Sequence, residues 1–198
     1  MALYQSNDRI ILASASPRRK ELLLSTGLPF EIEISKHDES SKYGEEPKSY
    51  ARRIAKEKAE CIAKNNQQAW VIGADTIVVL NGKVYGKPEN HQEAIQMLET
   101  LQGKTHQVIG AFAVLRKDKG IARVESHSTD VTMRPLSKQE IESYVASGEP
   151  MDKAGAYAIQ GAGASFIEEI RGSCTNVVGL NLSALLRVLV ELDVIGSK

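Results

Sequence analysis

The residues with the clearest chemical potential begin at position 14, where two serines, a proline and two arginines follow a short apolar run, in the order Ser14-Ala15-Ser16-Pro17-Arg18-Arg19. Ser16 suits the N-cap of a helix, and Pro17 suits its first position, where the missing N–H costs nothing. Arg18 and Arg19 then fall in the first turn, at the end of the helix dipole that carries partial positive charge. N–H groups, hydroxyls and guanidinium groups that meet in one place predict an anion site, best filled by several phosphate oxygens. The alternative is a capped surface helix whose arginines point into solvent.

A carboxylate interrupts the most apolar segment of the chain. Residues 69–80 are β-branched and nearly all apolar, which predicts a central strand, and Asp75 stands in the middle of them. Leaving a carboxylate buried without a partner is expensive, so Asp75 must be paired, bound to a metal, or exposed at a bend of the strand. A structural ion pair is the alternative to a functional role, since perturbed carboxylates gather at functional sites but not only there.

Two lysines are candidate partners for this carboxylate. Pro47 opens a predicted helix over residues 47–65, whose core-facing stripe at helical spacing is Ala51, Ile54, Ala55, Lys58 and Ile62. A lysine on a buried face either extends its ammonium group to solvent or meets a negative charge in a cleft. Lys87 follows a hairpin turn predicted at Asn81-Gly82, between a glycine and a proline, and either returns beside Asp75 or is an ordinary loop lysine.

Other elements must position these groups. Strands are expected at residues 30–34, 106–115, 121–134 and 166–170, and helices at 93–101, 137–146 and 181–192. The helix starts carry capping patterns at Asn90 with Glu93, at Ser137 with Glu140, and at Asn181.

Two loops are open to more than one interpretation. The polar residues 36–46 contain Asp38 and Glu39 and form either part of a site or solvated surface. Residues 147–164 are rich in glycine and alanine and contain Gln160. Small residues there allow either close backbone approach to a ligand or tight packing between elements.

The composition narrows the class of protein. The 198 residues are 42% hydrophobic, enough for one large domain or two closely joined lobes. Lysine plus arginine and aspartate plus glutamate both total 25, and this zero net charge argues against sequence-independent binding to a nucleic-acid polymer. Cys61 and Cys174 form no metal-ligand spacing and suggest no disulfide framework, and His91, His106 and His127 show no ligand spacing either. The sequence has no signal-peptide core and no apolar run of about 20 residues. We therefore expect a cytoplasmic protein that does not associate with membranes.

Several motifs occur in one order over nearly the whole chain: residues 12–19, Gly73-Ala74-Asp75-Thr76-Ile77-Val78, Gly86-Lys87-Pro88, Ser147-Gly148-Glu149-Pro150, residues 152–157, Ile159-Gln160-Gly161 and residues 176–180. Together they resemble the Maf family of nucleoside-triphosphate pyrophosphatases. The pairing of residues 152–157 with Ile159-Gln160-Gly161 resembles the subfamily that acts on dTTP and UTP rather than the one that acts on 7-methyl-GTP. The chain departs from the family pattern at Cys174, where tyrosine is usual, and at Asn181, where proline is usual.

The resemblance implies a single Maf-like domain over residues 1–198. Its fold would be α/β, an elongated mixed sheet with flanking helices that forms two lobes around a central cleft and is related to the inosine-triphosphatase fold. It also implies a divalent metal cation, Mg²⁺ or Mn²⁺, and a homodimer. The implied reaction is hydrolysis of a nucleoside triphosphate to the monophosphate and pyrophosphate.

The resemblance also assigns roles to single positions. Asp75 matches the family's catalytic acid; Thr76, Arg18 and Gln160 match its base-specificity positions; Glu39, Lys58 and Lys87 match its charged cleft residues. Asp75 and Glu39 are the available carboxylate ligands for the metal.

Chemistry suggests how these groups would work together. We expect Asp75, with the metal, to activate a water for attack on the α-phosphorus, while Lys58, Lys87, Arg18 and Arg19 stabilise charge on the phosphates. Ser14 and Ser16 would add hydroxyl contacts. The amide of Gln160 fits the N3–H and O4 edge of uracil or thymine.

Two other functions stay open at this point. One is a pyrophosphatase of the same fold with another base preference, such as 7-methyl-GTP or CTP. The other is a regulator of septum formation or cell division that binds a nucleotide without hydrolysing it.

Overall fold

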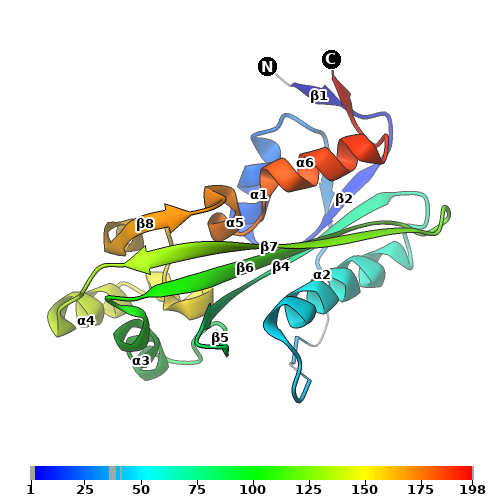
Figure 1. Ribbon diagram of the computed structural model, residues 1–198. Coiled ribbons are helices and arrows are strands. Elements are labelled where there is room, and N and C mark those ends of the chain that lie inside the picture. The colour runs from blue at the N-terminus through cyan, green and yellow to red at the C-terminus, as the bar shows by residue number, and fades with distance from the viewer. Residues whose placement is uncertain (1–2, 36–38, 41, 198) are drawn as a thin grey trace. The chain divides into compact units, whose positions relative to one another are not determined.

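The computed structural model describes residues 3–35, 39–40 and 42–197. Within them, seven strands form one mixed sheet in the order β3-β2-β4-β6-β7-β8, with β5 paired to β4, and β1 and β9 form a separate pair (Figure 1). The strands are β1 (Tyr4–Gln5), β2 (Ile10–Ala13), β3 (Glu31–Ile32), β4 (Trp70–Leu80), β5 (Lys83–Tyr85), β6 (Thr105–Arg116), β7 (Ile121–Met133), β8 (Ile167–Arg171) and β9 (Gly196–Ser197).

The helices of the described residues are α1 (Pro17–Leu24), α2 (Pro47–Ala63), α3 (His91–Leu101), α4 (Lys138–Ala146), α5 (Cys174–Val178) and α6 (Leu182–Glu191). Three short 3-10 helices, η1 (Glu149–Asp152), η2 (Ala154–Ala156) and η3 (Ala162–Phe166), lie in the segment rich in glycine and alanine. This arrangement confirms the predicted mixed α/β class. Among the described residues, no helix is both long and apolar enough to cross a lipid bilayer.

The chain divides into two compact units. The first unit comprises residues 1–75, 110–127 and 179–198, and the second comprises residues 76–109 and 128–178. In the first unit, β2 runs parallel to both β3 and β4. In the second, β5 folds back antiparallel on β4, so the predicted turn at Asn81-Gly82 is confirmed.

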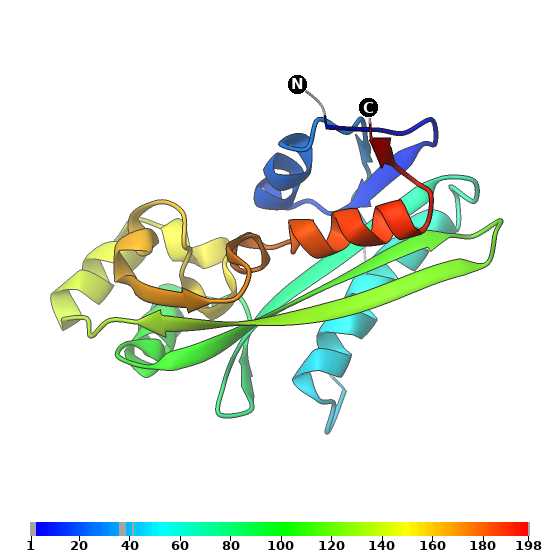
Figure 2. The same cartoon turned by 45° about the horizontal axis from the view of Figure 1, so that its top comes forward.

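The first unit has apolar packing on both faces of β2 and β4. Ile10 and Leu12 pack in one cluster with Trp70 and with residues of α6, while Ile11 packs in another cluster with residues of α2. Figures 1 and 2 show α6 and α2 on opposite sides of these strands. Because successive strand residues point to opposite faces, Val71, Gly73 and Asp75 lie on the face of β4 that is turned toward α2.

At Gly73, the backbone of α2 lies very close to β4. A Cβ atom at this position would lie 2.2 Å from the carbonyl oxygen of Ala55 and 2.8 Å from the backbone nitrogen of Ala59. Only a glycine lets the helix backbone approach the strand this closely. The spacing between α2 and β4 therefore depends on the bare α-carbon of Gly73.

Gly73→Ala is expected to lower the free energy of unfolding by about 3 kcal/mol, because the added methyl group has no space and the helix must shift. Urea unfolding followed by circular dichroism measures the change. Gly196→Ala is the matched control, since a Cβ at Gly196 meets nothing within 4 Å. A Gly73→Ala variant as stable as the control would contradict the close approach.

In the second unit, one apolar cluster joins β4, β6, α3 and α4, with Val78, Leu98, Tyr144 and Phe166 among its members. The segment rich in glycine and alanine packs into it. A Cβ at Gly155 would lie 2.9 Å from Val78 Cγ2. At these contacts, the small residues serve packing between elements, which was one of the two alternatives for this segment.

The histidines have structural surroundings in the described residues. His106 is buried, and its Nε2 lies 2.6 Å from the hydroxyl oxygen of Tyr157. Burial lowers the pKa of His106 to about 4, so this side chain is neutral at physiological pH. His127 stacks on Phe112, and His91 begins α3.

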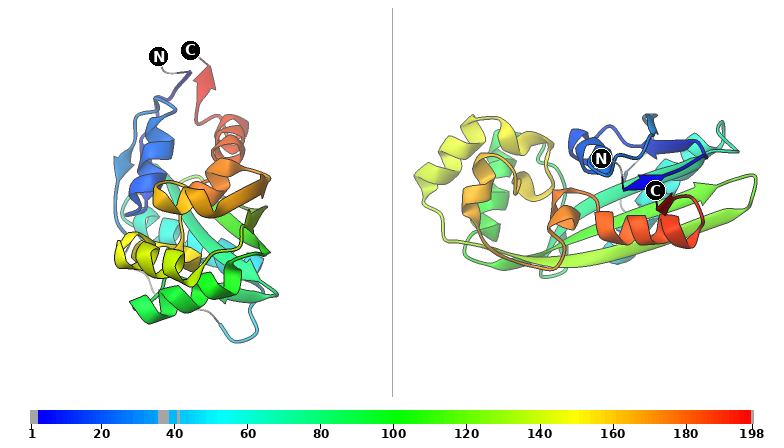
Figure 3. Two further views of the ribbon diagram at one scale, coloured as in Figure 1. Left: turned by 90° about the vertical axis from the view of Figure 1, so that its left-hand side faces the viewer. Right: turned by 90° about the horizontal axis from the view of Figure 1, so that it is seen from above.

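Most element predictions are confirmed, including the helix caps, in which the side chains of Asn90, Ser137 and Asn181 accept hydrogen bonds from backbone N–H groups of the first helical turn. The half-buried strand expected at residues 30–34 is wrong in length and burial. It is reduced to Glu31–Ile32 at the edge of the sheet, where Ile32 is 40% exposed and Ile34 is 64% exposed. The sequence pattern also missed α5 and the β1–β9 pair, whose strands lie side by side at the two ends of the chain (Figure 3).

Candidate active site

Parallel pairing brings the two chemically interesting stretches together. In the register of β2 with β4, Ala13 lies beside Gly73. Ser14 therefore leaves β2 next to the part of β4 that carries Asp75, and α1 begins three residues after Ser14. The carboxyl ends of parallel strands, followed by a helix N-terminus, are a common location for phosphate sites in α/β proteins.

Asp75 is paired with a buried lysine. The Nζ of Lys58 donates to Asp75 Oδ1 at 2.9 Å and lies 3.0 Å from Glu39 Oε1. Asp75 and Lys58 are 6% and 8% exposed, whereas the Glu39 side chain is half exposed. Of the two alternatives for Lys58, the structure shows the one in which the ammonium group meets a negative charge. Two carboxylates thus converge on the ammonium group of Lys58.

Helix α2 and Gly73 explain why Lys58 reaches this position. Ala51, Ile54, Ala55, Lys58 and Ile62 are all buried, as their helical spacing predicts. The bare α-carbon of Gly73, two residues before Asp75 on the same face of β4, lets the stripe approach the strand. Lys58, on the buried stripe of α2, therefore meets Asp75, on the facing side of β4.

Arg19 links the start of α1 to the same charges. Its Nη1 donates to Ser14 Oγ at 3.2 Å, and its Nε donates to the carbonyl oxygen of Gly179 at 2.9 Å. Burial lowers the pKa of the Arg19 guanidinium, whereas the negative charges of Asp75 and Glu39 act in the opposite direction. Arg18 adds a repulsive positive charge, and both arginines are partly buried. The two cations therefore share one electrostatic environment with the two carboxylates.

The two serines have different roles at the start of α1. Ser16 occupies the N-cap and Pro17 the first turn, as predicted, but the Ser16 side chain forms no capping hydrogen bond. Ser14 is buried, and its Oγ accepts from the backbone nitrogen of Ser16 at 3.3 Å as well as from Arg19. The predicted position of the N-cap is thus confirmed, but the predicted hydrogen bond from the first turn of the helix to the Ser16 hydroxyl is not formed.

Tyr50 is a site residue that the sequence analysis missed. Its hydroxyl donates to the backbone oxygen of Glu39 at 2.6 Å. Burial, and then the charges of Asp75 and Glu39, raise its pKa to about 12, so the phenol stays protonated near neutral pH. Tyr50 stands eight residues before Lys58 on α2, with Ile54 midway between them. This i, i+4, i+8 spacing is the signal that places it on the same face of the helix.

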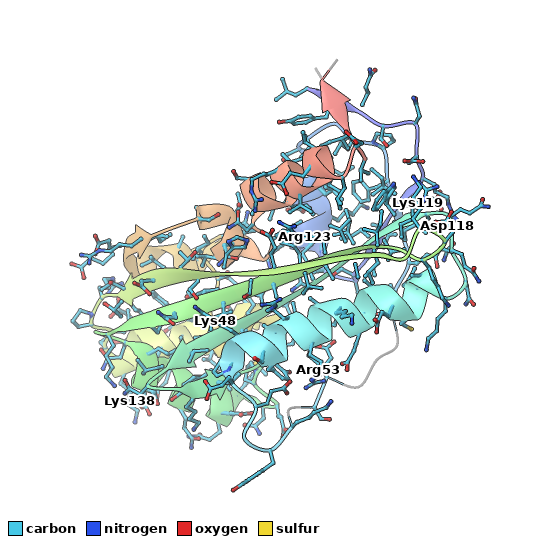
Figure 4. All side chains as sticks on the ribbon, turned by 45° about the vertical axis from the view of Figure 1, so that its right-hand side comes forward. Lys48, Arg53, Asp118, Lys119, Arg123 and Lys138 are labelled. Carbon is cyan, nitrogen blue, oxygen red and sulfur yellow. The ribbon has the colours of Figure 1, made fainter. Side chains whose placement is uncertain are left out.

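Arg53 fastens the chain around Glu39 to α2. Its guanidinium donates to both carboxylate oxygens of Glu45, at 2.7 and 2.6 Å, and also contacts Glu57 and the carbonyl oxygen of Ser40. Figure 4 shows Arg53 extending from α2. The hydrogen bonds from Arg53 lower the pKa of Glu45 to about 2. Asp38, which the sequence analysis named together with Glu39, lies outside the described residues.

Three predicted site residues belong to the second unit. Thr76 is partly buried in β4, Lys87 is exposed just after β5, and Gln160 is exposed between η2 and η3. The structure describes these residues within their own unit. The expectation that Lys87 and Gln160 act together with Asp75 therefore stays a prediction.

Asp75 and Glu39 are the candidate carboxylate ligands for a divalent metal ion. Among the described residues, no three aspartate, glutamate, histidine or cysteine side chains gather as a metal cage. Mg²⁺ is commonly held by one or two carboxylates together with substrate phosphates rather than by a full protein cage. Asp75 and Glu39, which both approach Lys58 Nζ, fit this donor set.

Comparison with known proteins identifies the family. The family model described as Maf-like protein matches residues 9–192. The chain belongs to the Maf family. It is 46% identical over 186 residues to a dTTP/UTP pyrophosphatase of Bacillus cereus (strain AH820), covering 94% of this chain and 96% of that protein. It is 47% identical over 185 residues to a dTTP/UTP pyrophosphatase of Syntrophus aciditrophicus (strain SB), covering 93% and 90%.

A solved structure supports the fold of this Maf-family chain. The Staphylococcus aureus Ham1 protein superposes with a TM-score of 0.53 at 16% sequence identity, covering 94% of this chain and 100% of that one. The likeness confirms the expected fold relationship. Of the two departures from the family pattern, Asn181 caps α6 by accepting from the backbone nitrogen of Ala184 at 3.2 Å, and Cys174 is exposed at the start of α5.

Proposed function

We propose that this Maf-family chain is a nucleoside-triphosphate pyrophosphatase that hydrolyses dTTP and UTP to the monophosphate and pyrophosphate. The observation that carries the proposal is the buried Asp75–Lys58 pair beside Ser14 and Arg19 at the start of α1. Similarity to relatives named dTTP/UTP pyrophosphatase, over more than nine-tenths of this chain, supports the substrate class.

The triphosphate would bind at the start of α1. Backbone N–H groups of the first turn attract anions, and no acidic side chain stands in that turn to compete. Arg18 and Arg19 supply guanidinium groups suited to phosphate oxygens, and Ser14 and Ser16 supply hydroxyls.

Asp75 would act as the general base. Its carboxylate takes a proton from a water molecule while the water oxygen forms a bond to the α-phosphorus. The bond between the α-phosphorus and the bridging oxygen breaks, and pyrophosphate leaves with the electron pair. Lys58 and Lys87 would offset the negative charge that grows on the phosphate oxygens and on the leaving group.

A divalent cation would add to this site. Asp75 and Glu39 would hold Mg²⁺ or Mn²⁺, because carboxylate oxygens suit both ions. When bound, such a cation polarises phosphoryl oxygens and lowers the pKa of a coordinated water. Tyr50 and Arg53 would support the metal site by holding the backbone around Glu39 against α2.

Gln160 would recognise the base, with Thr76 and Arg18 as further specificity positions. An amide offers one acceptor and two donors, which match N3–H and O4 of uracil or thymine. None of the assigned groups distinguishes the 5-methyl group or the 2′-hydroxyl, so both dTTP and UTP are expected to be substrates. The same proposal includes a single Maf-like domain over residues 1–198. It also includes a homodimer, and light scattering measures this oligomeric state.

A substrate panel tests the proposal. Pyrophosphate release is measured from dTTP, UTP, CTP, ITP and 7-methyl-GTP, with Mg²⁺ or Mn²⁺ and with EDTA. We expect dTTP and UTP to be the best substrates and EDTA to abolish the release. A tenfold preference for a purine triphosphate would overturn the base assignment. Binding without pyrophosphate release would instead favour a regulatory nucleotide-binding protein.

A further inference from the structure

One carboxylate of the second unit has several hydrogen bonds that the proposed chemistry does not use. Glu149, the first residue of η1, accepts from the backbone nitrogen of Ala162 at 3.1 Å, from that of Gly163 at 3.1 Å, and from the Tyr144 hydroxyl at 3.0 Å. Two of these donors belong to the backbone that directly follows Gln160 and Gly161. Glu149 therefore ties this turn to the end of α4.

The carboxylate also packs against the residue next to Gln160. A Cβ at Gly161 would lie 2.9 Å from Glu149 Oε2 and 3.0 Å from its Oε1. Gly161 has φ 79° and ψ −153°, a backbone conformation that is essentially restricted to glycine. Glu149 therefore fills the space that a side chain at residue 161 would need, and the backbone conformation there independently favours glycine.

The charge of Glu149 strengthens this arrangement. Burial by itself would raise the pKa of Glu149, but the hydrogen bonds from Gly163, Ala162 and Tyr144 outweigh burial and lower the pKa. Lys153 adds a favourable positive charge, and its Nζ donates to the backbone oxygen of Glu149 at 2.7 Å. The side chain is an anion at neutral pH, and hydrogen bonds to an anion are stronger than those to a neutral acceptor.

We propose that Glu149 is a positioning residue for base recognition: its carboxylate fixes the turn at Gly161–Gly163 and thereby holds Gln160 in the conformation that meets the pyrimidine. The inference rests on the proposed function, because it assumes that Gln160 contacts the base. Glu149 itself needs no contact with the nucleotide.

Glu149→Gln tests the role with little change in shape. An amide has one acceptor oxygen, and its NH₂ group faces a backbone N–H that it cannot accept from, so the turn loses one anchor. We expect KM for UTP and dTTP to rise about tenfold while kcat stays within about threefold, which corresponds to the loss of one charge-assisted hydrogen bond. Glu142→Gln, an exposed glutamate on α4, is the matched control and should behave as wild type.

A double-mutant cycle separates positioning from general stability. If Glu149 acts through Gln160, Glu149→Gln has little further effect on KM in a Gln160→Ala background, because the group it positions is gone. Equal effects of Glu149→Gln in both backgrounds would overturn the proposal, and so would an unchanged KM in the single variant. The proposed function fails separately, if the wild-type protein hydrolyses neither UTP nor dTTP. This assay comes before any variant is made, so the two failures are distinguished.

Tyr144→Phe gives an independent result if Glu149→Gln does not fold. It removes one of the three donors and keeps the ring that packs edge-on against Phe166. A smaller KM increase of about threefold that disappears with Gln160→Ala supports the positioning role. A KM equal to that of wild type, or an increase that persists with Gln160→Ala, contradicts it.

Discussion

Asp75→Asn is expected to yield a folded protein with less than about 1% of wild-type pyrophosphatase activity, because an amide cannot accept the proton of the attacking water. The amide has nearly the same shape, and its oxygen still accepts from Lys58, so the fold should be retained. Steady-state pyrophosphate release from UTP measures the activity, and circular dichroism measures the fold. The loss should appear in kcat rather than in KM if Asp75 acts in the transition state.

Asp118→Asn is the matched control for this variant. Asp118 lies with Lys119 at the turn between β6 and β7 (Figure 4). Its backbone nitrogen contacts the carbonyl oxygen of Gln67, which precedes β4 and stands eight residues before Asp75. The control should keep full activity. An Asp75→Asn enzyme with more than a tenth of wild-type kcat would remove Asp75 from the role of base.

Lys58→Met should damage both stability and activity. The change leaves the buried carboxylate of Asp75 without its ammonium partner, and breaking a buried pair in this way costs about 3–5 kcal/mol of unfolding free energy. Loss of a positive charge next to the reacting phosphates should also lower kcat about 100-fold. Urea unfolding and steady-state kinetics measure the two effects.

A neighbouring lysine and a double variant show where the effect of Lys58→Met arises. Lys56→Met removes an exposed lysine of the same helix, paired with Glu60 at 3.4 Å, and should change stability by less than about 0.5 kcal/mol. Combining Lys58→Met with Asp75→Asn should restore part of the lost stability, because a neutral amide does not need the ammonium group. If the double variant is less stable than Lys58→Met alone, the uncompensated carboxylate is not the cause.

Local pattern was enough to predict the parts of the site that lie on regular elements. The buried stripe that contains Lys58 follows from helical spacing, and Asp75 stands out because its neighbours are apolar. The cost of a buried charge then required a partner for Asp75, and Lys58 is that partner.

The contacts that local pattern could not predict join distant parts of the chain. Arg19 donates to the carbonyl oxygen of Gly179, 160 positions further along, and a backbone acceptor leaves no mark in residue type. The bonds from Arg53 to Glu45 and Ser40 join α2 to residues outside any helix or strand, where side chains have no regular period. The capping motif at Ser16 predicted the helix start but not the missing side-chain bond, because serine hydroxyls have alternative partners at a helix start.

The bare α-carbon of Gly73 has a consequence for how variants of this enzyme are searched. The ion pair between Lys58 and Asp75 forms where α2 lies close to β4, and this close approach needs a hydrogen atom at residue 73 where every other residue type carries a Cβ. A mutational scan limited to charged and polar positions would overlook residue 73, although a side chain there would collide with the backbone of α2, the helix that carries Lys58. In directed evolution of substrate range, position 73 should therefore remain glycine.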